Sequence, residues 1–133
     1  MVLLDGKKTA QDIQLEIAEK VKCLKADGKK TPHLAAILVG GDGASLTYVN
    51  AKVKACEKVG FESTLVHIDA TTSEEDLLNK IDELNNDDAI DGFIVQLPLP
   101  KHIDEAKVTL AVSPRKDVDG FHPENIGKMC LNL

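Results

Sequence analysis

Apolar runs alternate with amphipathic stretches along most of this chain. Residues 34–39 form an unbroken apolar run, which is typical of a strand buried on both faces of a sheet. Segments of the same length near 63–68 and at 92–97 indicate two more strands. Because each interval between these runs is long enough for a helix, the pattern predicts successive βαβ units and a parallel sheet.

Two helices are predicted before the second strand. The first opens at Thr9, with Asp12 as its capping-box partner, and stops at Gly28. Its apolar stripe consists of Ile13, Ile17, Val21 and Leu24. We expect this stripe to cover one face of the sheet. The second helix runs over about 45–59 and is closed by Gly60.

The later helices are shorter. Ser73 is expected to cap a third helix. The apolar positions of that helix are Leu77, Ile81 and Leu84. Residues 104–112 predict a further short helix before Pro114, whereas the tail, 115–133, is expected to be irregular. Since right-handed crossovers place helices on both faces of a parallel sheet, the predicted fold is a three-layer α/β/α domain.

The composition fits one globular domain without a membrane or nucleic-acid role. A chain of 133 residues, 43% of them hydrophobic, is enough for one core and too short for two. Its net charge of −6 disfavours binding to nucleic acid. No apolar run approaches the roughly 20 residues that cross a bilayer, and charge begins at Asp5, too early for a signal peptide. We therefore expect a cytoplasmic protein.

The cysteines and histidines show no pattern of a metal or nucleophile site. The cysteines are Cys23, Cys56 and Cys130. They lie far apart without C-x-x-C spacing, so we expect reduced thiols that serve as small apolar fillers. The histidines are His33, His67, His102 and His122. They are scattered without the spacing of metal ligands, and we assign them no catalytic role.

Two segments should face a common cleft at the carboxyl edge of the sheet, where ligands of open parallel sheets bind. One is the glycine loop 40–43, and the other is Gln96 with the proline-rich turn that follows it. The glycine spacing matches neither the G-x-G-x-x-G fingerprint nor a P-loop, so it is a weak sign of a phosphate site. The amide of Gln96 either belongs to a site or is satisfied by nearby backbone.

The second helix carries the clearest candidate chemistry. At about 3.6 residues per turn, Ser45, Tyr48 and Lys52 fall within a sector of about 60°. Apolar positions surround this sector: Val49, Val53, Ala55, Cys56 and Val59. An ammonium among apolar groups loses hydration, which favours the neutral amine and makes Lys52 a candidate acid/base. The alternatives are that Lys52 extends to the edge of its face or pairs with a carboxylate, and that Tyr48 is ordinary core.

A pair of acidic residues follows the predicted short helix. Asp117 and Asp119 stand two positions apart, and in extended chain this spacing directs their carboxylates to opposite sides. We therefore expect at most one of them to face a ligand. The alternative is a solvated acidic turn, and the further ligands of a calcium loop are missing.

Three segments together resemble one enzyme family. They read VGGDGASLTYVNAKVKACEKVG from Val39, GFIVQLPLPKHI from Gly92, and PRKDVDGFHPENIGK from Pro114. In this order and spacing they are similar to the bifunctional methylenetetrahydrofolate dehydrogenase/cyclohydrolase family. The resemblance implies NADP-dependent oxidation of 5,10-methylenetetrahydrofolate and hydrolysis of the methenyl product to 10-formyltetrahydrofolate. These reactions belong to the one-carbon metabolism that also serves purine biosynthesis.

The resemblance also implies roles for individual residues. Lys52 matches the catalytic lysine, which Gln96 would hydrogen-bond and tune. Tyr48 would stack on the folate rings, and Asp119 would bind the amino edge of the pterin. Ser45 would support the region of the lysine. Two further residues, Leu97 and Pro98, would contact the substrate.

The resemblance further implies partners and a missing part. Residues 1–133 would be the folate-binding catalytic domain, while the family's NADP-binding Rossmann domain is absent from this chain. The complete protein is expected to be a homodimer that acts on tetrahydrofolate derivatives. Two alternatives remain: a module that binds folate or another anion without turnover, and a structural or dimerising piece, in which Lys52 and Tyr48 would be packed beneath a neighbouring element.

Overall fold

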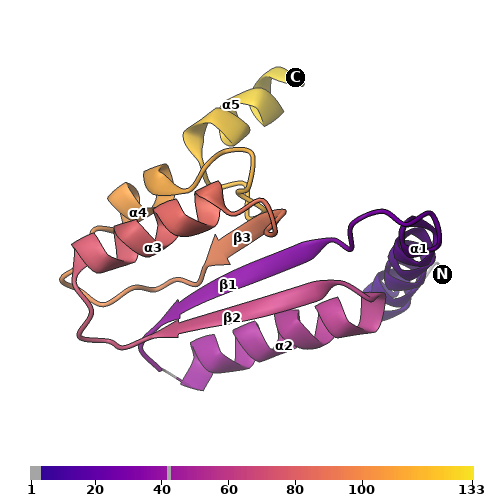
Figure 1. Ribbon diagram of the computed structural model, residues 1–133, viewed down its shortest axis with the longest axis horizontal. Helices are drawn as coiled ribbons and strands as arrows, with labels where there is room; N and C mark the ends of the chain where they lie inside the picture. Colours follow the sequence, from indigo (N-terminus) through magenta and orange to yellow (C-terminus); the bar gives the residue numbers. More distant parts are fainter. Residues whose placement is uncertain (1–3, 42) are drawn as a thin grey trace.

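A computed structural model describes residues 4–41 and 43–133 (Figure 1). The elements are α1 (Gly6–Ala26), β1 (His33–Val39), α2 (Gly43–Val59), β2 (Glu62–Ile68), α3 (Glu74–Asn86), β3 (Gly92–Val95), α4 (Glu105–Ala111) and α5 (Pro123–Leu131). Each predicted helix and strand has a counterpart in this order. The start of the chain before residue 4, and Asp42 of the glycine loop, lie outside the described residues.

The three strands form one parallel sheet in the order β2-β1-β3. Strand β1 is central, and its Leu34 is in register with Ser63 of β2 and Gly92 of β3. Because β1 has a strand on each side and helices above and below, its residues 35–39 are all buried. The prediction of successive βαβ units is therefore confirmed.

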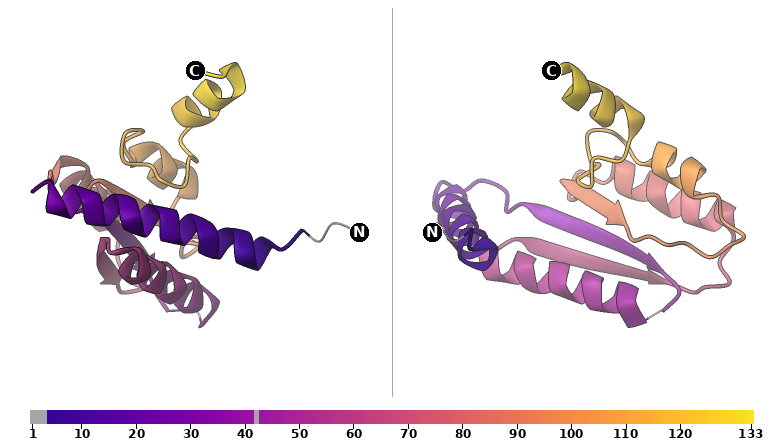
Figure 2. Two further views of the ribbon diagram at one scale, coloured as in Figure 1. Left: turned by 90° about the vertical axis from the view of Figure 1, so that its right-hand side faces the viewer. Right: turned by 180° about the vertical axis from the view of Figure 1, so that it is seen from behind.

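Helices cover both faces of the sheet, which confirms the three-layer α/β/α architecture (Figures 1 and 2). Helices α3 and α4 cover one face over a large apolar core that includes Ile37, Leu77 and Phe93. Helix α2 covers the other face over a smaller core of Ala36, Leu38, Val49 and Ile94. Ser73 caps α3 as predicted, since its hydroxyl accepts a hydrogen bond from the backbone N–H of Asp76 at 3.0 Å.

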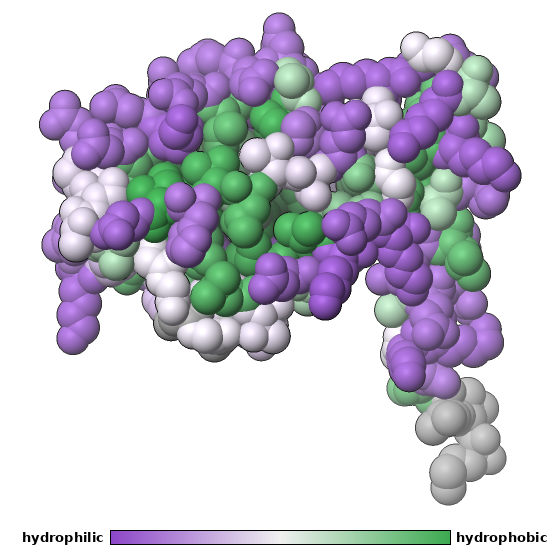
Figure 3. All heavy atoms as spheres, turned by 60° about the horizontal axis from the view of Figure 1, so that its bottom comes forward, coloured by the Kyte–Doolittle hydropathy of each residue, from purple (hydrophilic) through white to green (hydrophobic). Residues whose placement is uncertain are grey.

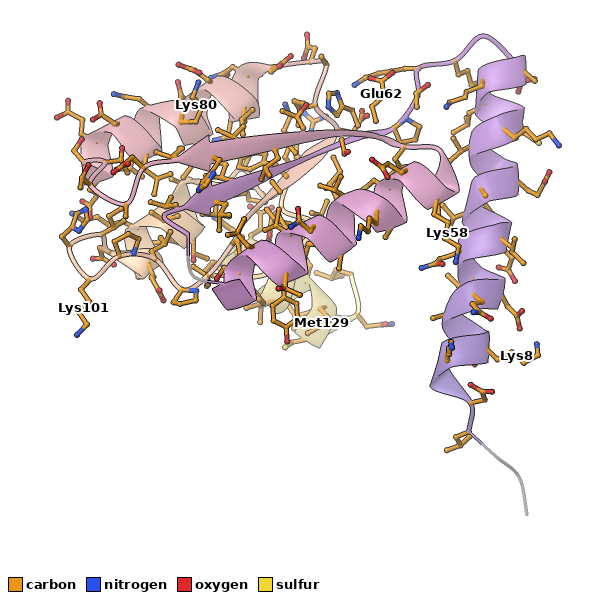
Figure 4. All side chains as sticks on the ribbon, turned by 90° about the horizontal axis from the view of Figure 1, so that it is seen from below. Lys8, Lys58, Glu62, Lys80, Lys101 and Met129 are labelled. Carbon is orange, nitrogen blue, oxygen red and sulfur yellow. The ribbon has the colours of Figure 1, made fainter. Side chains whose placement is uncertain are left out.

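Helix α1 differs from its prediction in both its start and its place. It begins at Gly6, where the Asp5 side chain accepts a hydrogen bond from Lys8 N at 2.9 Å. It packs against the last turns of α2 rather than on the sheet, so Val21 is buried while Ile13 stays 49% exposed. Figure 4 shows Lys58 of α2 beside α1, and Lys8 at the far end of α1, away from α2. Only the C-terminal half of the apolar stripe therefore has a partner.

The tail, predicted to be irregular, contains helix α5. His122 caps this helix, its Nδ1 accepting a hydrogen bond from Glu124 N at 3.1 Å, and Pro123 occupies the first turn. Asn132 ends it in the left-handed conformation with φ 56°. No residue of α5 is buried, so the helix has end signals but little of the core burial on which the sequence prediction relied.

The thiols only partly fulfil their predicted role as fillers. Cys56 is a buried residue of α2, whereas Cys23 and Cys130 are exposed, and all three are free thiols. Burial raises the pKa of the Cys56 thiol, and the neighbouring charge of Glu57 adds to this effect. Among residues 4–41 and 43–133, no group of three or more metal-ligating side chains is found. Within the same residues, no helix is long and apolar enough to cross a membrane.

Candidate functional site

Three polar side chains from separate segments meet at the carboxyl edge of the sheet. Lys52 lies on α2, Gln96 directly follows β3, and Asp119 lies in the loop before α5. The Lys52 Nζ is 3.5 Å from Gln96 Oε1 and 3.9 Å from Asp119 Oδ1. The structure thus places together the lysine, the amide and the carboxylate that the sequence analysis had singled out.

The surroundings of Lys52 are less apolar than expected. Its side chain is 38% exposed, and that of Asp119 is 30% exposed. The prediction of an amine enclosed by apolar groups is therefore wrong, and the alternative of a lysine paired with a carboxylate describes the site. The helix positions Lys52 at the edge of its buried face, from which the long stem reaches the polar partners.

The contacts of Gln96 combine the two alternatives left open for it. Its backbone N–H donates to Ile37 O at 2.9 Å, which continues the pairing of β3 with β1 by one residue. The side-chain Nε2 donates to Leu97 O at 2.7 Å, while Oε1 faces Lys52. The backbone therefore holds the amide nitrogen and leaves the amide oxygen directed at the amine.

The other predicted substrate residues surround this cluster at different depths. Tyr48 lies one turn before Lys52 and is 66% exposed, so it is not ordinary core and its ring is open to a ligand. Ser45, in the first turn of α2, is buried. Leu97 is half-buried, Pro98 is exposed, and the peptide bond between them is cis.

A shallow, solvent-open pocket of about 20 Å³ lies beside Asp119, and neither Lys52 nor Gln96 is among its lining residues. Its walls come from β3, the turn after it, α4 and the loop before α5, and they include Leu97, Val108, Asp119 and Phe121. In Figure 3 apolar residues gather in the middle of one face of the body, and hydrophilic residues surround them. Asp119 is thus the residue that joins the polar cluster to the largely apolar pocket of β3 and α4.

The glycine loop does not share this pocket. Gly40 and Gly41 line a different solvent-open pocket with His67 and Asp69, and His67 Nε2 is 2.6 Å from Gly40 O. Gly40 has a φ of 77°, the positive value expected of this loop. Gln96 lines neither of these two pockets, so the expectation that the glycine loop and Gln96 face one cleft stays a prediction.

The two aspartates of the loop before α5 face different surroundings, as their spacing predicts. Asp119 faces Lys52, whereas the Asp117 carboxylate accepts hydrogen bonds from Gly120 N at 3.0 Å, His122 N at 2.9 Å and Asn125 Nδ2 at 2.9 Å. Burial disfavours ionisation of Asp117, but the hydrogen bonds to it outweigh burial and leave its pKa lower than usual. Asp117 is not part of a solvated acidic turn.

Asn125 is a polar residue of this region that the sequence analysis missed. It lies in α5, which was not predicted, and its side chain joins Asp117 to Pro114 O at 2.9 Å. The residues next to Asn125 do not indicate that its side chain is hydrogen-bonded, because both of its partners, Asp117 and Pro114, lie earlier in the chain. The only signal that could have drawn attention to it is the helix-start pattern of Pro123 and Glu124, which the sequence analysis did not use.

Comparisons with known proteins agree with this geometry. The chain is similar to the bifunctional protein FolD of Flavobacterium psychrophilum, at 68% identity over 133 residues, which are 100% of this chain and 45% of that protein. The FolD of Bacteroides thetaiotaomicron is 59% identical over the same residues and 45% of its length. The chain thus spans about half the length of the curated relatives it matches.

Solved structures show the same likeness. The bifunctional enzyme FolD, methylenetetrahydrofolate dehydrogenase/cyclohydrolase, from Campylobacter jejuni matches with a TM-score of 0.95 and 45% identity, over 100% of this chain and 47% of that one. The methylenetetrahydrofolate dehydrogenase-cyclohydrolase of Trypanosoma brucei, complexed with NADP cofactor and inhibitor, matches with a TM-score of 0.91 and 36% identity, over 96% of this chain and 43% of that one. The family model described as tetrahydrofolate dehydrogenase/cyclohydrolase, catalytic domain, matches residues 4–119. The chain therefore belongs to the tetrahydrofolate dehydrogenase/cyclohydrolase family and corresponds to its catalytic domain.

Proposed function

We propose that this chain supplies the folate site and the catalytic lysine of an enzyme with two activities. One is NADP-dependent oxidation of 5,10-methylenetetrahydrofolate, and the other is hydrolysis of the methenyl product to 10-formyltetrahydrofolate. The observation that carries the proposal is the position of Lys52 Nζ, 3.5 Å from Gln96 Oε1 and 3.9 Å from Asp119 Oδ1, in a member of this family.

In the hydrolysis, Lys52 moves protons to and from the one-carbon unit. Water adds to the cationic carbon between N5 and N10 and loses one proton to solvent. The Lys52 ammonium then donates a proton to N5 as the bond between the carbon and N5 breaks. The remaining hydroxyl proton passes to the lysine amine as the formyl C=O forms, so the lysine is restored and one proton is released overall.

Gln96 and Asp119 serve this step by orientation and charge. The amide oxygen of Gln96 accepts from the lysine and keeps Nζ at the carboxyl edge of the sheet. The carboxylate of Asp119 would accept hydrogen bonds from the amino edge of the pterin, and its negative charge balances the cation beside it. Tyr48 offers an exposed ring for stacking, and Ser45, Leu97 and Pro98 are the other proposed substrate residues.

For the oxidation, NADP supplies the hydride acceptor when it is bound. The glycines of this sequence do not form the dinucleotide fingerprint, so we assign no residue of this chain to the nucleotide. The proposal places the nucleotide on a second domain, which accords with a chain that spans 45% of its relatives. NADP is proposed as the cofactor because the related enzyme of T. brucei was solved in complex with NADP.

The complete enzyme is proposed to act in the cytoplasm as a homodimer, and its product would supply one-carbon units for purine biosynthesis. These statements rest on the family assignment. Gel filtration of the gene's full-length product, with light scattering, would test the dimer.

The test of the proposed function is Lys52→Ala in the gene's full-length product, assayed for methenyltetrahydrofolate hydrolysis. We expect the rate to fall by about 10²–10⁴-fold, the usual contribution of a general acid or base, with an unchanged circular dichroism spectrum. Lys54→Ala is the matched control, because Lys54 is an exposed lysine of the same helix. Retained activity in Lys52→Ala would remove the lysine from the mechanism. If the unmodified protein binds the folate without hydrolysing it, the chain is a binding module instead.

A further inference from the structure

The loop that carries Asp119 is hydrogen-bonded to β3 through the first residues of the loop, Lys116 and Asp117. Phe93 N donates to Lys116 O at 2.9 Å, and Phe93 pairs with Asp117 as an isolated parallel bridge. Gly92 permits this approach, because a Cβ at that position would lie 2.5 Å from Val118 Cγ1. The loop therefore leaves β3 from a fixed starting point.

A second attachment holds the same residues to the end of α3. The Lys116 amine donates to Leu84 O at 2.8 Å and to Asp87 O at 2.7 Å. Leu84 lies in the last turn of α3, and Asp87 is its C-cap. Carbonyls at the end of a helix have no partner within the helix, so the lysine ammonium supplies their hydrogen bonds. Lys116 thus faces away from the site and serves as an anchor.

The C-terminal part of the loop is hydrogen-bonded to one side chain, the carboxylate of Asp117. Asp117 Oδ1 accepts from Gly120 N, and Oδ2 accepts from both His122 N and Asn125 Nδ2. These three donors follow Asp119 in the chain, so the Asp117 carboxylate closes the loop on itself around Asp119. Asn125 adds the link to Pro114 O, which ties the start of α5 to the start of the loop.

Asp119 has no comparable anchor of its own. Within the described part of the chain, its carboxylate has one polar partner within 4 Å, the Lys52 amine at 3.9 Å. Its position is therefore set by the backbone on either side of it. We propose that Asp117 is a positioning residue, whose three hydrogen bonds hold the Asp119 carboxylate where it can meet Lys52 and the substrate. This inference rests on the proposed function and adds a residue to it.

The substitution Asp117→Asn tests the role with little change in shape. An amide offers one oxygen and one NH2 group, whereas both oxygens of Asp117 accept hydrogen bonds. In either orientation at least one N–H of the loop then faces another donor, and that part of the loop must open. Asp91→Asn is the matched control. The Asp91 carboxylate also accepts a backbone N–H, that of His33 at 2.8 Å, but it lies at the amino end of the sheet.

The experiment compares Asp117→Asn, Asp119→Asn, the double variant and Asp91→Asn in the gene's full-length product. The measured quantities are kcat and KM for methenyl hydrolysis and the amide exchange rates of Gly120 and His122. We expect Asp117→Asn to raise KM by about tenfold with kcat changed by less than about threefold. The double variant should have the KM of Asp119→Asn alone, because the two residues act through one contact. Both amides should exchange faster in Asp117→Asn, while Asp91→Asn leaves KM and both amides unchanged.

Three results would overturn the inference, and they separate it from the proposed function. An unchanged KM in Asp117→Asn beside a raised KM in Asp119→Asn removes the positioning role and leaves the function intact. Additive effects in the double variant show that Asp117 acts by another route. Wild-type activity in both Asp119→Asn and Lys52→Ala rejects the proposed function, and the inference falls with it.

Asn125→Ala provides a second route if Asp117→Asn does not fold. This variant keeps the Asp117 carboxylate and two of its three donors, so it should fold. We expect KM to rise by about threefold in Asn125→Ala, again with no further rise when Asp119→Asn is added. A KM equal to that of the unmodified protein would count against the positioning role.

Discussion

The two faces of the sheet differ in how much apolar surface they bury. Among the described residues, the core toward α3 and α4 contains thirteen buried residues, including Leu77, Ile81 and Phe93, whereas the core toward α2 contains four. The proposed catalytic lysine lies on the thinly packed side, at the edge of α2. The difference indicates that the face toward α3 and α4 supplies most of the buried core, whereas Lys52 and Tyr48 of the site come from α2 on the other face.

The largest loss of stability is expected from Leu77→Ala, on the heavily packed face. Leu77 is fully buried, and truncation of a buried leucine costs about 2–5 kcal/mol through lost transfer free energy and the cavity left behind. Urea unfolding should show this loss while KM for the folate stays unchanged. A raised KM would mean that the two faces are not separate in function.

A smaller loss is expected from Val49→Ala, on the thinly packed face. Val49 is fully buried, but fewer groups are removed, so about 2 kcal/mol is expected. Because Val49 precedes Lys52 by less than one turn of α2, this variant should also raise KM, which separates it from Leu77→Ala. The comparison would be sharpened by assaying both variants at a temperature where each is fully folded.

Acid should weaken the fold through carboxylates on both sides of the molecule. The Lys30 amine and the His33 N–H hold the pKa of Asp91 below its usual value, although burial acts against them, and hydrogen bonds do the same for Asp117. A lowered folded pKa stabilises the fold above the ordinary pKa near about 4, and that contribution is lost as the pH falls through the folded pKa. The free energy of unfolding should therefore drop from about pH 5 downwards.

Asp91→Asn and Asp117→Asn should each reduce this acid slope. The Asp91 contribution belongs to the amino end of the sheet, and the Asp117 contribution to the loop beside the site, so the two reductions should add. Urea titrations at several pH values would measure them. A slope that neither variant changes would assign the acid sensitivity to other carboxylates.

The smallest stability change is expected from Tyr48→Ala. The side chain is 66% exposed, so its removal should change the free energy of unfolding by less than about 0.5 kcal/mol. KM for the folate should nevertheless rise, because the stacking surface is lost. Equal KM values for Tyr48→Ala and the unmodified protein would exclude the ring from the substrate site.

The sequence predicted what depends on local periodicity and end signals. The buried strand β1, the cap of α3 by Ser73 and the grouping of Tyr48 with Lys52 on α2 all follow from spacing within one segment. The opposite directions of Asp117 and Asp119 followed likewise from an extended spacing.

What the sequence could not predict depends on contacts between distant segments. The place of α1 against α2 is decided by contacts such as Lys25 Nζ to Gly60 O at 2.8 Å, which no local pattern encodes. The surroundings of Lys52 were misjudged for the same reason, because the carboxylate beside it comes from a loop much later in the chain. Helix α5 was missed because the prediction looked for apolar side chains that pack into the core, and those of α5 stay exposed.

The wide separation in sequence of Lys52, Gln96 and Asp119 bears on how activity returns after denaturation. The Lys52 amine and the Gln96 amide oxygen meet only after β1 and β3 have paired, and α2, β2 and α3 lie between these strands in the sequence. The Asp119 carboxylate comes from a segment still later in the chain. Such non-local contacts form slowly compared with helices. In a refolding experiment, the helical circular dichroism signal should therefore recover before hydrolysis does, and the interval between them would time the assembly of the active centre.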